Sequence, residues 1–214
     1  MKTPDDYSIS MAYSYQSSDE LSDYYDDSAD GYDEYAKSVG YVLPRLVAEK
    51  AYDFLTDEPI IDIGCGTGIL GIELHSLKNG LLLHGADVSQ KMILHAYSKK
   101  KLDGSRYYDK LHYTDLTKNN SVPTNYYGLM VSSGTFTTGH LDSNHLSMVI
   151  DLMKPKSHAV FSVKSNHFDD AGFQNKLNEL NNNMIIKILD ICEVDSYDND
   201  GYTALSKIVS LKIN

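Results

Sequence analysis

The fold is decided by one stretch, Asp62-Ile63-Gly64-Cys65-Gly66-Thr67-Gly68-Ile69-Leu70-Gly71. It follows an apolar run over 59–63 that is typical of a short buried strand, and it leads into a helical pattern over 70–77. Alternate glycines let the backbone turn sharply and pass close to a ligand, because no Cβ intervenes. The helix after them presents free N–H groups and a partial positive charge. The stretch therefore predicts a ligand-binding loop at the carboxyl end of a strand.

Strand and helix patterns alternate on both sides of this loop. Further strands are expected over 81–87, 107–113, 127–132 and 158–163, and helices over 44–55, 89–99, 143–153 and 171–181. Two long β-type runs, 184–194 and 202–213, close the chain around the turn Asp198-Asn199-Asp200-Gly201. The pattern predicts an α/β, Rossmann-like three-layer sandwich. Its seven-stranded sheet is mostly parallel, with the last strand antiparallel in a C-terminal hairpin.

Length and composition indicate a soluble globular protein. The chain has 214 residues, of which 42% are hydrophobic and 23% are charged, which suits a single core. It contains no apolar run long enough to span a membrane, and its first residues do not resemble a secretory signal. Two cysteines, Cys65 and Cys192, form neither a disulfide framework nor a zinc quartet. We therefore expect a cytoplasmic protein that does not act at a membrane.

The negative charge is concentrated at the N-terminus. Of the net charge of −11, residues 1–35 contribute ten acids against one base, and the remainder holds 20 acids against 18 bases. A nucleic-acid enzyme usually shows a basic stripe that neutralises phosphates, and the sequence has none. We expect a flexible acidic segment over 1–22, a helical lid over 23–57 and the ligand-binding domain over 58–214.

Two ligand classes fit the glycine loop. The spacing Gly66-x-Gly68-x-x-Gly71, followed by Asp87, also matches a dinucleotide fingerprint. However, Asp62 stands directly before the loop, where its carboxylate would repel a pyrophosphate and would suit a cationic ammonium group. No second domain is left to bind the substrate of a hydride donor. These features favour a ligand with an ammonium group over a nicotinamide dinucleotide.

Three motifs resemble those of the class I S-adenosylmethionine-dependent methyltransferases. The run 61–68 resembles the family's first motif, Gly85-Ala86-Asp87-Val88 the second, and Tyr113-Thr114-Asp115-Leu116 the third. The resemblance implies that the first motif wraps the methionine part of the cofactor, that Asp87 accepts hydrogen bonds from both ribose hydroxyls, and that Asp115 contacts the adenine. One departure is Gly128, which stands near the start of the fourth strand where the family often has an acid.

The resemblance assigns a set of residues to S-adenosylmethionine or its product S-adenosylhomocysteine. They come from the glycine loop, from the ends of the second and third strands, and from the exit of the fourth: Asp62, Gly64, Cys65, Gly66, Gly68, Asp87, Val88, Met92, Asp115, Leu116, Ser132 and Ser133. A narrower resemblance links residues 25–46 and 134–140 to the Williams–Beuren-region methyltransferase-like proteins.

Methyl transfer needs an acceptor held in line with the methyl group, and a base only where the acceptor must lose a proton. His140 and Tyr32 are the candidate catalytic residues, and Tyr32, Tyr41, Thr135 and His140 the candidate residues for binding the acceptor. The alternatives are a plain loop histidine and rings that only pack a lid helix. The acidic, tyrosine-rich N-terminus would suit a lid over a small acceptor, cationic or neutral.

We expect no metal, although His140, Asp142 and His145 lie close together in sequence. Metal-dependent members of the superfamily carry acids after the fourth strand, where this chain has Ser132-Ser133.

Three functions remain open: a methyltransferase for a small-molecule acceptor, a non-catalytic S-adenosylmethionine-binding module, and a nicotinamide-dependent oxidoreductase. The first is favoured, in a monomer or homodimer that binds no nucleic acid. The N/D-P-P-Y/F motif of nucleic-acid aminomethylating enzymes is absent after the fourth strand.

Overall fold

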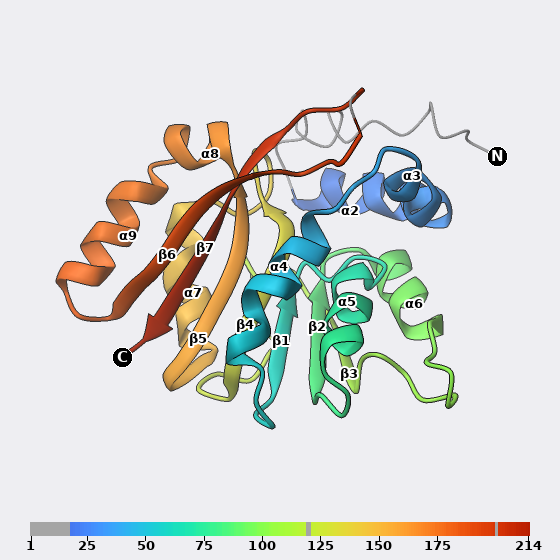
Figure 1. The fold of residues 1–214 in the computed structure, drawn as a ribbon, viewed down its shortest axis with the longest axis horizontal. Coiled ribbons are helices and arrows are strands. Elements are labelled where there is room, and N and C mark those ends of the chain that lie inside the picture. Colours follow the sequence, from blue (N-terminus) through green and yellow to red (C-terminus); the bar gives the residue numbers. More distant parts are fainter. Residues whose placement is uncertain (1–17, 119–120, 200) are drawn as a thin grey trace.

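The computed structural model describes residues 18–118, 121–199 and 201–214. They form a seven-stranded sheet in the order β3-β2-β1-β4-β5-β7-β6. The strands are β1 (Ile60–Ile63), β2 (Leu83–Asp87), β3 (Lys110–Tyr113), β4 (Tyr127–Phe136), β5 (Met153–Lys164), β6 (Ile186–Asp195) and β7 (Leu205–Ile213). β7 lies between β5 and β6 and runs antiparallel to both. The predicted Rossmann-like sandwich with an antiparallel last strand is confirmed (Figure 1).

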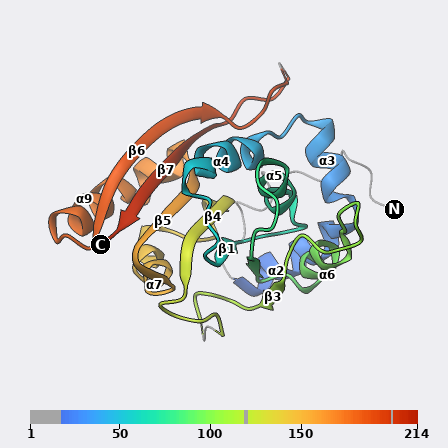
Figure 2. The same cartoon turned by 60° about the horizontal axis from the view of Figure 1, so that its bottom comes forward.

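Helices cover both faces of the sheet. On one face lie α4 (Leu43–Ala51), α5 (Ile69–Leu77) and α6 (Gln90–Ser98), and on the other α7 (Leu146–Asp151), α8 (Ser165–Asp170) and α9 (Phe173–Asn182). Figure 2 shows α4 and α5 on the opposite side of the sheet from α7. Because successive strand side chains point to opposite faces, Ile60 enters one core and Ile61 the other. Each is fully buried, which contributes about 1.5–3 kcal/mol per side chain.

β4 is longer than the sequence predicts. The pattern places its end at Ser132, but the strand continues to Phe136 through a register shift against β5. Gly134 takes a φ of +76° within this irregular stretch, a conformation that favours glycine. The irregular end of β4 places Ser133 and Thr135 at the mouth of the sheet, beside the glycine loop.

A second difference concerns the N-terminal segment. Helix α2 (Ser18–Ser28) begins inside the segment predicted to be flexible, and Leu21 is only 4% exposed. Residues 1–17 of that segment lie outside the described residues. The segment 23–57, predicted to be one lid, has two parts with different positions in the structure. α2, the short helix η2 (Ala29–Gly31) and α3 (Tyr32–Ser38) lie above the carboxyl ends of the strands, whereas α4 packs against the sheet (Figure 1).

Side chains of the lid helices bind the domain beneath them. Asp26 Oδ1 accepts hydrogen bonds from Ser89 Oγ at 2.6 Å and from the Lys91 backbone N–H at 2.9 Å. Asp33 Oδ1 accepts one from Thr67 Oγ1 at 2.5 Å. These contacts lie at the starts of α5 and α6, where acidic groups also suit the helix dipole. Two lid acids therefore act as docking groups.

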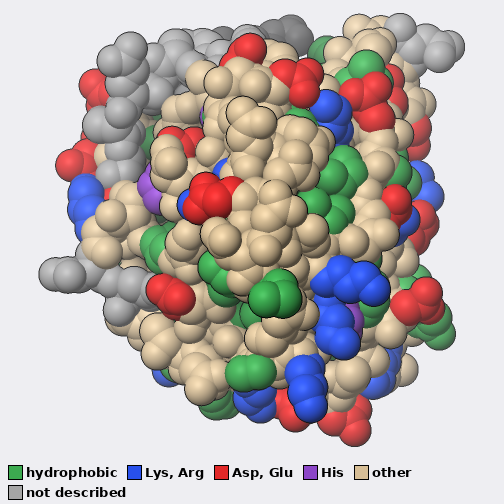
Figure 3. All heavy atoms as spheres, turned by 90° about the vertical axis from the view of Figure 1, so that its left-hand side faces the viewer, with side chains coloured by type: hydrophobic (Ala, Val, Ile, Leu, Met, Phe, Trp, Pro, Cys, Tyr) green, Lys and Arg blue, Asp and Glu red, His purple; other side chains and the backbone are tan. Residues whose placement is uncertain are grey.

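Three further observations bear on the sequence predictions. Among the described helices, none is long and apolar enough to cross a membrane. On the face formed by α8, α9 and β6, acidic and basic side chains are interspersed (Figure 3). The predicted hairpin turn includes Asp200, which lies outside the described residues, although β6 and β7 on either side of it are paired.

Candidate functional site

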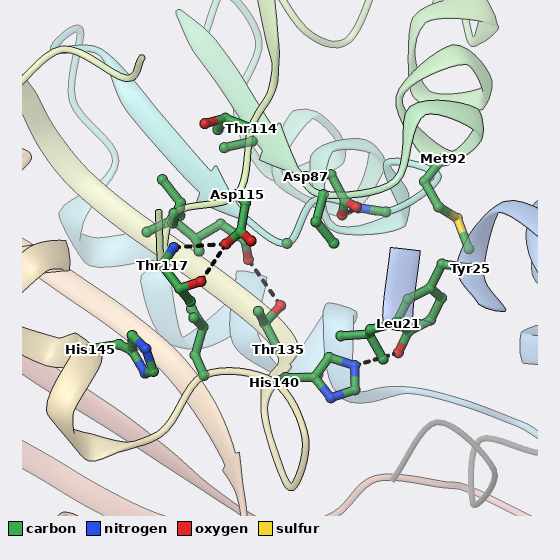
Figure 4. A pocket seen from close by; sticks show the side chains of 18 of the residues that line it. Leu21, Tyr25, Asp87, Met92, Thr114, Asp115, Thr117, Thr135, His140 and His145 are labelled. Carbon is green, nitrogen blue, oxygen red and sulfur yellow. Dashed lines mark hydrogen bonds between the residues drawn. The ribbon is translucent and has the colours of Figure 1, made fainter. Parts of the chain in front are cut away.

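A cavity of about 310 Å³ lies at the carboxyl ends of β1, β2, β3 and β4, beneath α2 and α3. Small-molecule pockets begin at about this size. Figure 4 shows Asp87 and Asp115 along one wall, with Tyr25 and His140 across from them. The cavity therefore brings together residues of the glycine loop, of four strand ends and of the lid.

Most of the predicted site residues line this cavity: Tyr32, Gly64, Gly66, Asp87, Val88, Met92, Asp115, Leu116, Ser133, Thr135 and His140. Four others lie behind or beside its wall: Asp62, Cys65, Gly68 and Ser132. The last, Tyr41, lines a neighbouring smaller cavity.

The glycine loop has the backbone conformation that its sequence suggests. Gly64 has a φ of +68°, and a Cβ there would lie 2.0 Å from Thr135 Oγ1. Gly66 has a φ of +53°, and a Cβ there would meet no atom within 4 Å. Gly64 is therefore required by a close approach within the protein, whereas Gly66 faces open space in the cavity wall. A ligand that used this cavity would contact the backbone at Gly66.

Asp62 is buried beneath the loop, with 1% of its surface exposed. Its Oδ2 accepts a hydrogen bond from the Tyr108 hydroxyl at 2.7 Å, while Oδ1 has no partner among the described residues. Burial raises the pKa of Asp62 to about 7; the Tyr108 hydrogen bond opposes the rise, and the charge of Asp87 adds to it. A buried acceptor without a donor is costly, so a cationic ligand group would stabilise this carboxylate.

Asp87 is held at the end of β2 by the backbone. Its Oδ2 accepts a hydrogen bond from the Gly66 N–H and its Oδ1 one from the Ser89 N–H, both at 2.8 Å. Burial is the main cause that raises the pKa of Asp87, and these backbone hydrogen bonds oppose the rise. A carboxylate has about four acceptor positions. The fixed carboxylate therefore has capacity left for ligand hydroxyls on its cavity side.

Asp115 follows β3 and forms part of a turn. Its Oδ1 accepts hydrogen bonds from the backbone N–H and the hydroxyl of Thr117, at 2.9 and 2.6 Å. Lys118 Nζ lies 3.3 Å from the other carboxylate oxygen. The side chain therefore stabilises the loop that forms this wall of the cavity.

The side chains of Cys65 and Ser132 are buried within the protein and have structural roles. Cys65 is 5% exposed, and burial raises the pKa of its thiol, which stays protonated. The Ser132 hydroxyl donates to the backbone oxygen of Ile63 at 2.7 Å and so ties β4 to β1. In contrast, Ser133 lines the cavity, and its Oγ has no hydrogen-bond partner among the described residues.

His140 and Tyr25 form a hydrogen-bonded pair in the cavity wall. His140 Nδ1 lies 3.1 Å from the backbone oxygen of Thr138, and Nε2 lies 2.9 Å from the Tyr25 hydroxyl. Burial lowers the pKa of His140 to about 4. Because a carbonyl oxygen only accepts, we infer that the neutral ring has its proton on Nδ1. The Tyr25 hydroxyl then donates to Nε2.

The neighbouring residues Asp142 and His145 have a local role. The Asp142 carboxylate accepts a hydrogen bond from the Asn144 backbone N–H, and His145 Nδ1 accepts one from the Asp142 backbone N–H. They form a capping box at the start of the short helix η4 (Ser143–His145). Among the described residues, no group of three or more His, Cys, Asp or Glu side chains is placed to hold a metal ion.

Ten lining residues were not among the predicted site residues: Leu21, Tyr25, Ile63, Ala86, Thr114, Thr117, Gly134, Gly139, Leu141 and His145. The sequence does contain a helical pattern around Leu21 and Tyr25. Apolar and small side chains recur there at helical spacing, after acids that suit a first helical turn: Leu21, Tyr24, Tyr25 and Ser28. The acidic and polar composition of the segment masked this pattern.

Solved structures resemble this fold over most of the chain. A proposed S-adenosyl-L-methionine-dependent methyltransferase from Methanococcus maripaludis has a TM-score of 0.61 at 18% identity, covering 86% of this chain and 92% of its own. A SAM-dependent methyltransferase from Aquifex aeolicus has a TM-score of 0.56 at 15% identity, covering 81% and 92%. The [4+2]-cyclase SpnF has a TM-score of 0.71 at 14% identity, covering 93% and 97%.

No protein-family profile and no curated protein sequence matches the chain. The sheet order and the solved structures agree with each other, and together they establish that this chain has the fold of the class I S-adenosylmethionine-dependent methyltransferases.

Proposed function

We propose that the protein binds S-adenosylmethionine in the 310 Å³ cavity and transfers its methyl group to a small-molecule acceptor. The observation on which this depends is the arrangement of Gly66 and Asp87 in the wall of one cavity, with the buried Asp62 carboxyl behind that wall. Gly66 leaves space for a ligand beside its backbone, and Asp87 offers a fixed carboxylate to hydroxyl groups. One oxygen of the buried Asp62 carboxyl has no hydrogen-bond donor in the part of the chain that the structure describes. The residues present therefore fit the cofactor.

Each of these residues has a distinct task in this proposal. Asp87 accepts hydrogen bonds from the ribose hydroxyls, and Asp62 stabilises the ammonium group directly or through water. When bound, the cofactor supplies an electrophilic methyl group: a lone pair of the acceptor bonds to the methyl carbon, and the electron pair of the broken C–S bond stays on sulfur. Where the acceptor must lose a proton, the Tyr25 hydroxyl oxygen takes it and passes its own proton to His140 Nε2.

Several finer points belong to the same proposal. We propose membership of the Williams–Beuren-region group on the sequence resemblance of residues 25–46 and 134–140 alone. We further propose a cytoplasmic monomer or homodimer that needs no metal and binds neither nucleic acid nor membrane.

The fold alone does not fix the reaction, because one structural neighbour is a [4+2]-cyclase. Binding is therefore the first test. Calorimetric titration compares S-adenosylmethionine, S-adenosylhomocysteine and NADH on the wild type, on Asp87→Asn and on Asp53→Asn. Asp53 is exposed and lies outside the cavity lining, so its variant is the matched control.

We expect both adenosyl ligands to bind the wild type and the control alike. Asp87→Asn should bind them about tenfold to a hundredfold more weakly, because a hydrogen bond to a charged group contributes about 1.5–3 kcal/mol. Binding of NADH alone would overturn the proposal in favour of an oxidoreductase. Adenosyl binding without turnover of any acceptor would favour the non-catalytic module.

A further inference from the structure

Tyr108 precedes β3 and packs into the interior beside the glycine loop, outside the lining of the cavity. Its side chain is 3% exposed. A Cβ on Gly71 would lie 2.6 Å from the tyrosine ring and from its hydroxyl oxygen. A Cβ on Gly68 or Gly85 would lie 2.9 or 3.0 Å from a ring carbon. Because contacts this short would force the ring to move, the three glycines determine where the ring lies.

The hydroxyl of Tyr108 meets the carboxyl of Asp62. It donates a hydrogen bond to Oδ2 at 2.7 Å, and both side chains are buried. Oδ1 of the same carboxyl has no hydrogen-bond donor in the part of the chain that the structure describes. The two oxygens of Asp62 therefore differ: the protein holds one of them, and the other is left for a ligand.

The charges around Asp62 make the Tyr108 hydrogen bond important for ionisation. The titratable groups that interact with Asp62 are Asp87, Cys65 and Tyr108. Asp87 brings a like charge, and the other two stay protonated because burial raises the pKa of the Cys65 thiol and of the Tyr108 hydroxyl. Burial and Asp87 raise the pKa of Asp62, and the Tyr108 hydrogen bond lowers it. Tyr108 therefore orients the carboxyl and also favours its ionised form.

We propose that Tyr108 is a positioning residue for the methyl donor: it holds Asp62 Oδ2, so that Oδ1 is left for the ammonium group of S-adenosylmethionine, directly or through water. This inference rests on the proposed function, because it assigns that ammonium group to Asp62. Tyr108 is not among the residues that line the cavity, so it acts through the carboxyl. Its effect on binding therefore requires both an ammonium group on the ligand and an ionisable residue 62. A role in packing alone would require neither.

The test compares two ligands by calorimetric titration. S-adenosylhomocysteine has the ammonium group, whereas methylthioadenosine has the adenosine part without it. Tyr108→Phe removes the hydroxyl and keeps the ring among the three glycines. Tyr127→Phe is the matched control: Tyr127 is also buried, its hydroxyl lies 3.1 Å from His84 Nδ1, and it lies outside the cavity lining. Melting temperatures verify that each variant folds.

We expect Tyr108→Phe to weaken the binding of S-adenosylhomocysteine at pH 7 several-fold, up to about tenfold. The reason is that a smaller fraction of Asp62 is ionised without the hydroxyl, and a shift of one pKa unit corresponds to about a tenfold change. Methylthioadenosine should bind Tyr108→Phe as it binds the wild type, and Tyr127→Phe should bind both ligands normally. An equal loss for both ligands, or no loss for either, would overturn the inference.

The pH profile and a double variant test the same inference independently. The affinity of the wild type for S-adenosylhomocysteine should level off near pH 7, where Asp62 ionises, and that of Tyr108→Phe about one pH unit higher. In an Asp62→Asn background, Tyr108→Phe should have no further effect. An unchanged profile, or the same loss in that background, would contradict the positioning role. Failure of the wild type to bind S-adenosylhomocysteine would instead overturn the proposed function, so the two failures are distinguishable.

Discussion

The hydroxyl of Tyr25 on α2 lies 2.9 Å from Nε2 of His140, although 115 positions separate the two residues in sequence. The contact joins the lid to the loop that follows β4, inside the wall of the larger cavity. It also fixes the role of each ring nitrogen of His140, because Nδ1 faces the backbone oxygen of Thr138. A histidine placed in this way is neutral at physiological pH and has a basic nitrogen in contact with a phenol.

The state of His140 is the first prediction. We expect long-range proton–nitrogen NMR to show a neutral ring at pH 7 with its proton on Nδ1, and a pKa of about 4 set by burial. Tyr25→Phe should change the Nε2 shift because it removes the donor, whereas Tyr52→Phe, at an exposed site, should not. A ring protonated at pH 7, or a proton on Nε2, would contradict the geometry.

The glycine loop offers a matched pair of variants. Gly66 and Gly80 both have positive φ, +53° and +73°, and a Cβ would meet no atom within 4 Å at either position. Alanine at either site should therefore cost about 1–2 kcal/mol of unfolding free energy. Only Gly66→Ala should also lower the affinity for S-adenosylhomocysteine, by tenfold or more in calorimetry, because its methyl group would fill the cavity wall. Equal affinities would remove Gly66 from the binding site.

The sheet and the larger part of the candidate site were predictable because they depend on local signals. The glycine loop and the end of β2 combine a strand, a turn and a helix start within a few residues, so Gly64, Gly66 and Asp87 could be placed together from sequence. Ser89 caps the helix that follows, because its Oγ accepts the Met92 N–H at 3.1 Å. Such a cap contributes about 1 kcal/mol.

Contacts between distant segments were not predictable in this way. Asp62 accepts its hydrogen bond from Tyr108, and no local sequence pattern links the two residues. The burial of the Asp62 carboxyl was therefore apparent only from the fold. Tyr25 was missed as a lining residue because α2 is acidic and has few apolar side chains.

Asp62 leads to a prediction about pH. Its folded pKa of about 7 means that the carboxyl is mostly protonated below that pH, whereas an ammonium ligand favours the ionised form. The affinity for S-adenosylhomocysteine should therefore rise as pH increases from about 5 to 7, by up to tenfold per pH unit. Asp62→Asn should lower the affinity at pH 7 and abolish this dependence. A wild-type affinity that is constant between pH 5 and 7 would show that Asp62 does not ionise on binding.

The docking of the lid depends on Asp26, which accepts two hydrogen bonds at the start of α6. We expect Asp26→Ala to accelerate hydrogen exchange in residues 18–38 without faster exchange in the sheet, because the two large cores do not include this contact. The affinity for S-adenosylhomocysteine should fall, since Leu21 and Tyr25 line the cavity from the same helix. Asp23→Ala, at an exposed position of α2, is the control, and equal exchange in both variants would contradict the proposed docking role.

His112 on β3 should make the fold sensitive to acid. It is 5% exposed, its Nε2 has no partner among the described residues, and burial is the main cause that lowers its pKa to about 4. Between that pKa and about 6.5, the unfolded chain binds a proton that the folded chain does not. The unfolding free energy should therefore fall as pH drops from about 6.5 to 4, and this residue contributes up to about 3 kcal/mol of the loss.

His112→Leu tests this prediction because it removes the titrating group and keeps an apolar side chain of similar size. Urea unfolding at a series of pH values should give a flatter stability curve for the variant, with the largest gain relative to the wild type near pH 4. Part of the slope should remain, since the pKa of His140 is lowered by burial as well. Parallel curves for the two proteins would mean that His112 binds its proton equally well in the folded and unfolded chains, and that its burial does not oppose the charge.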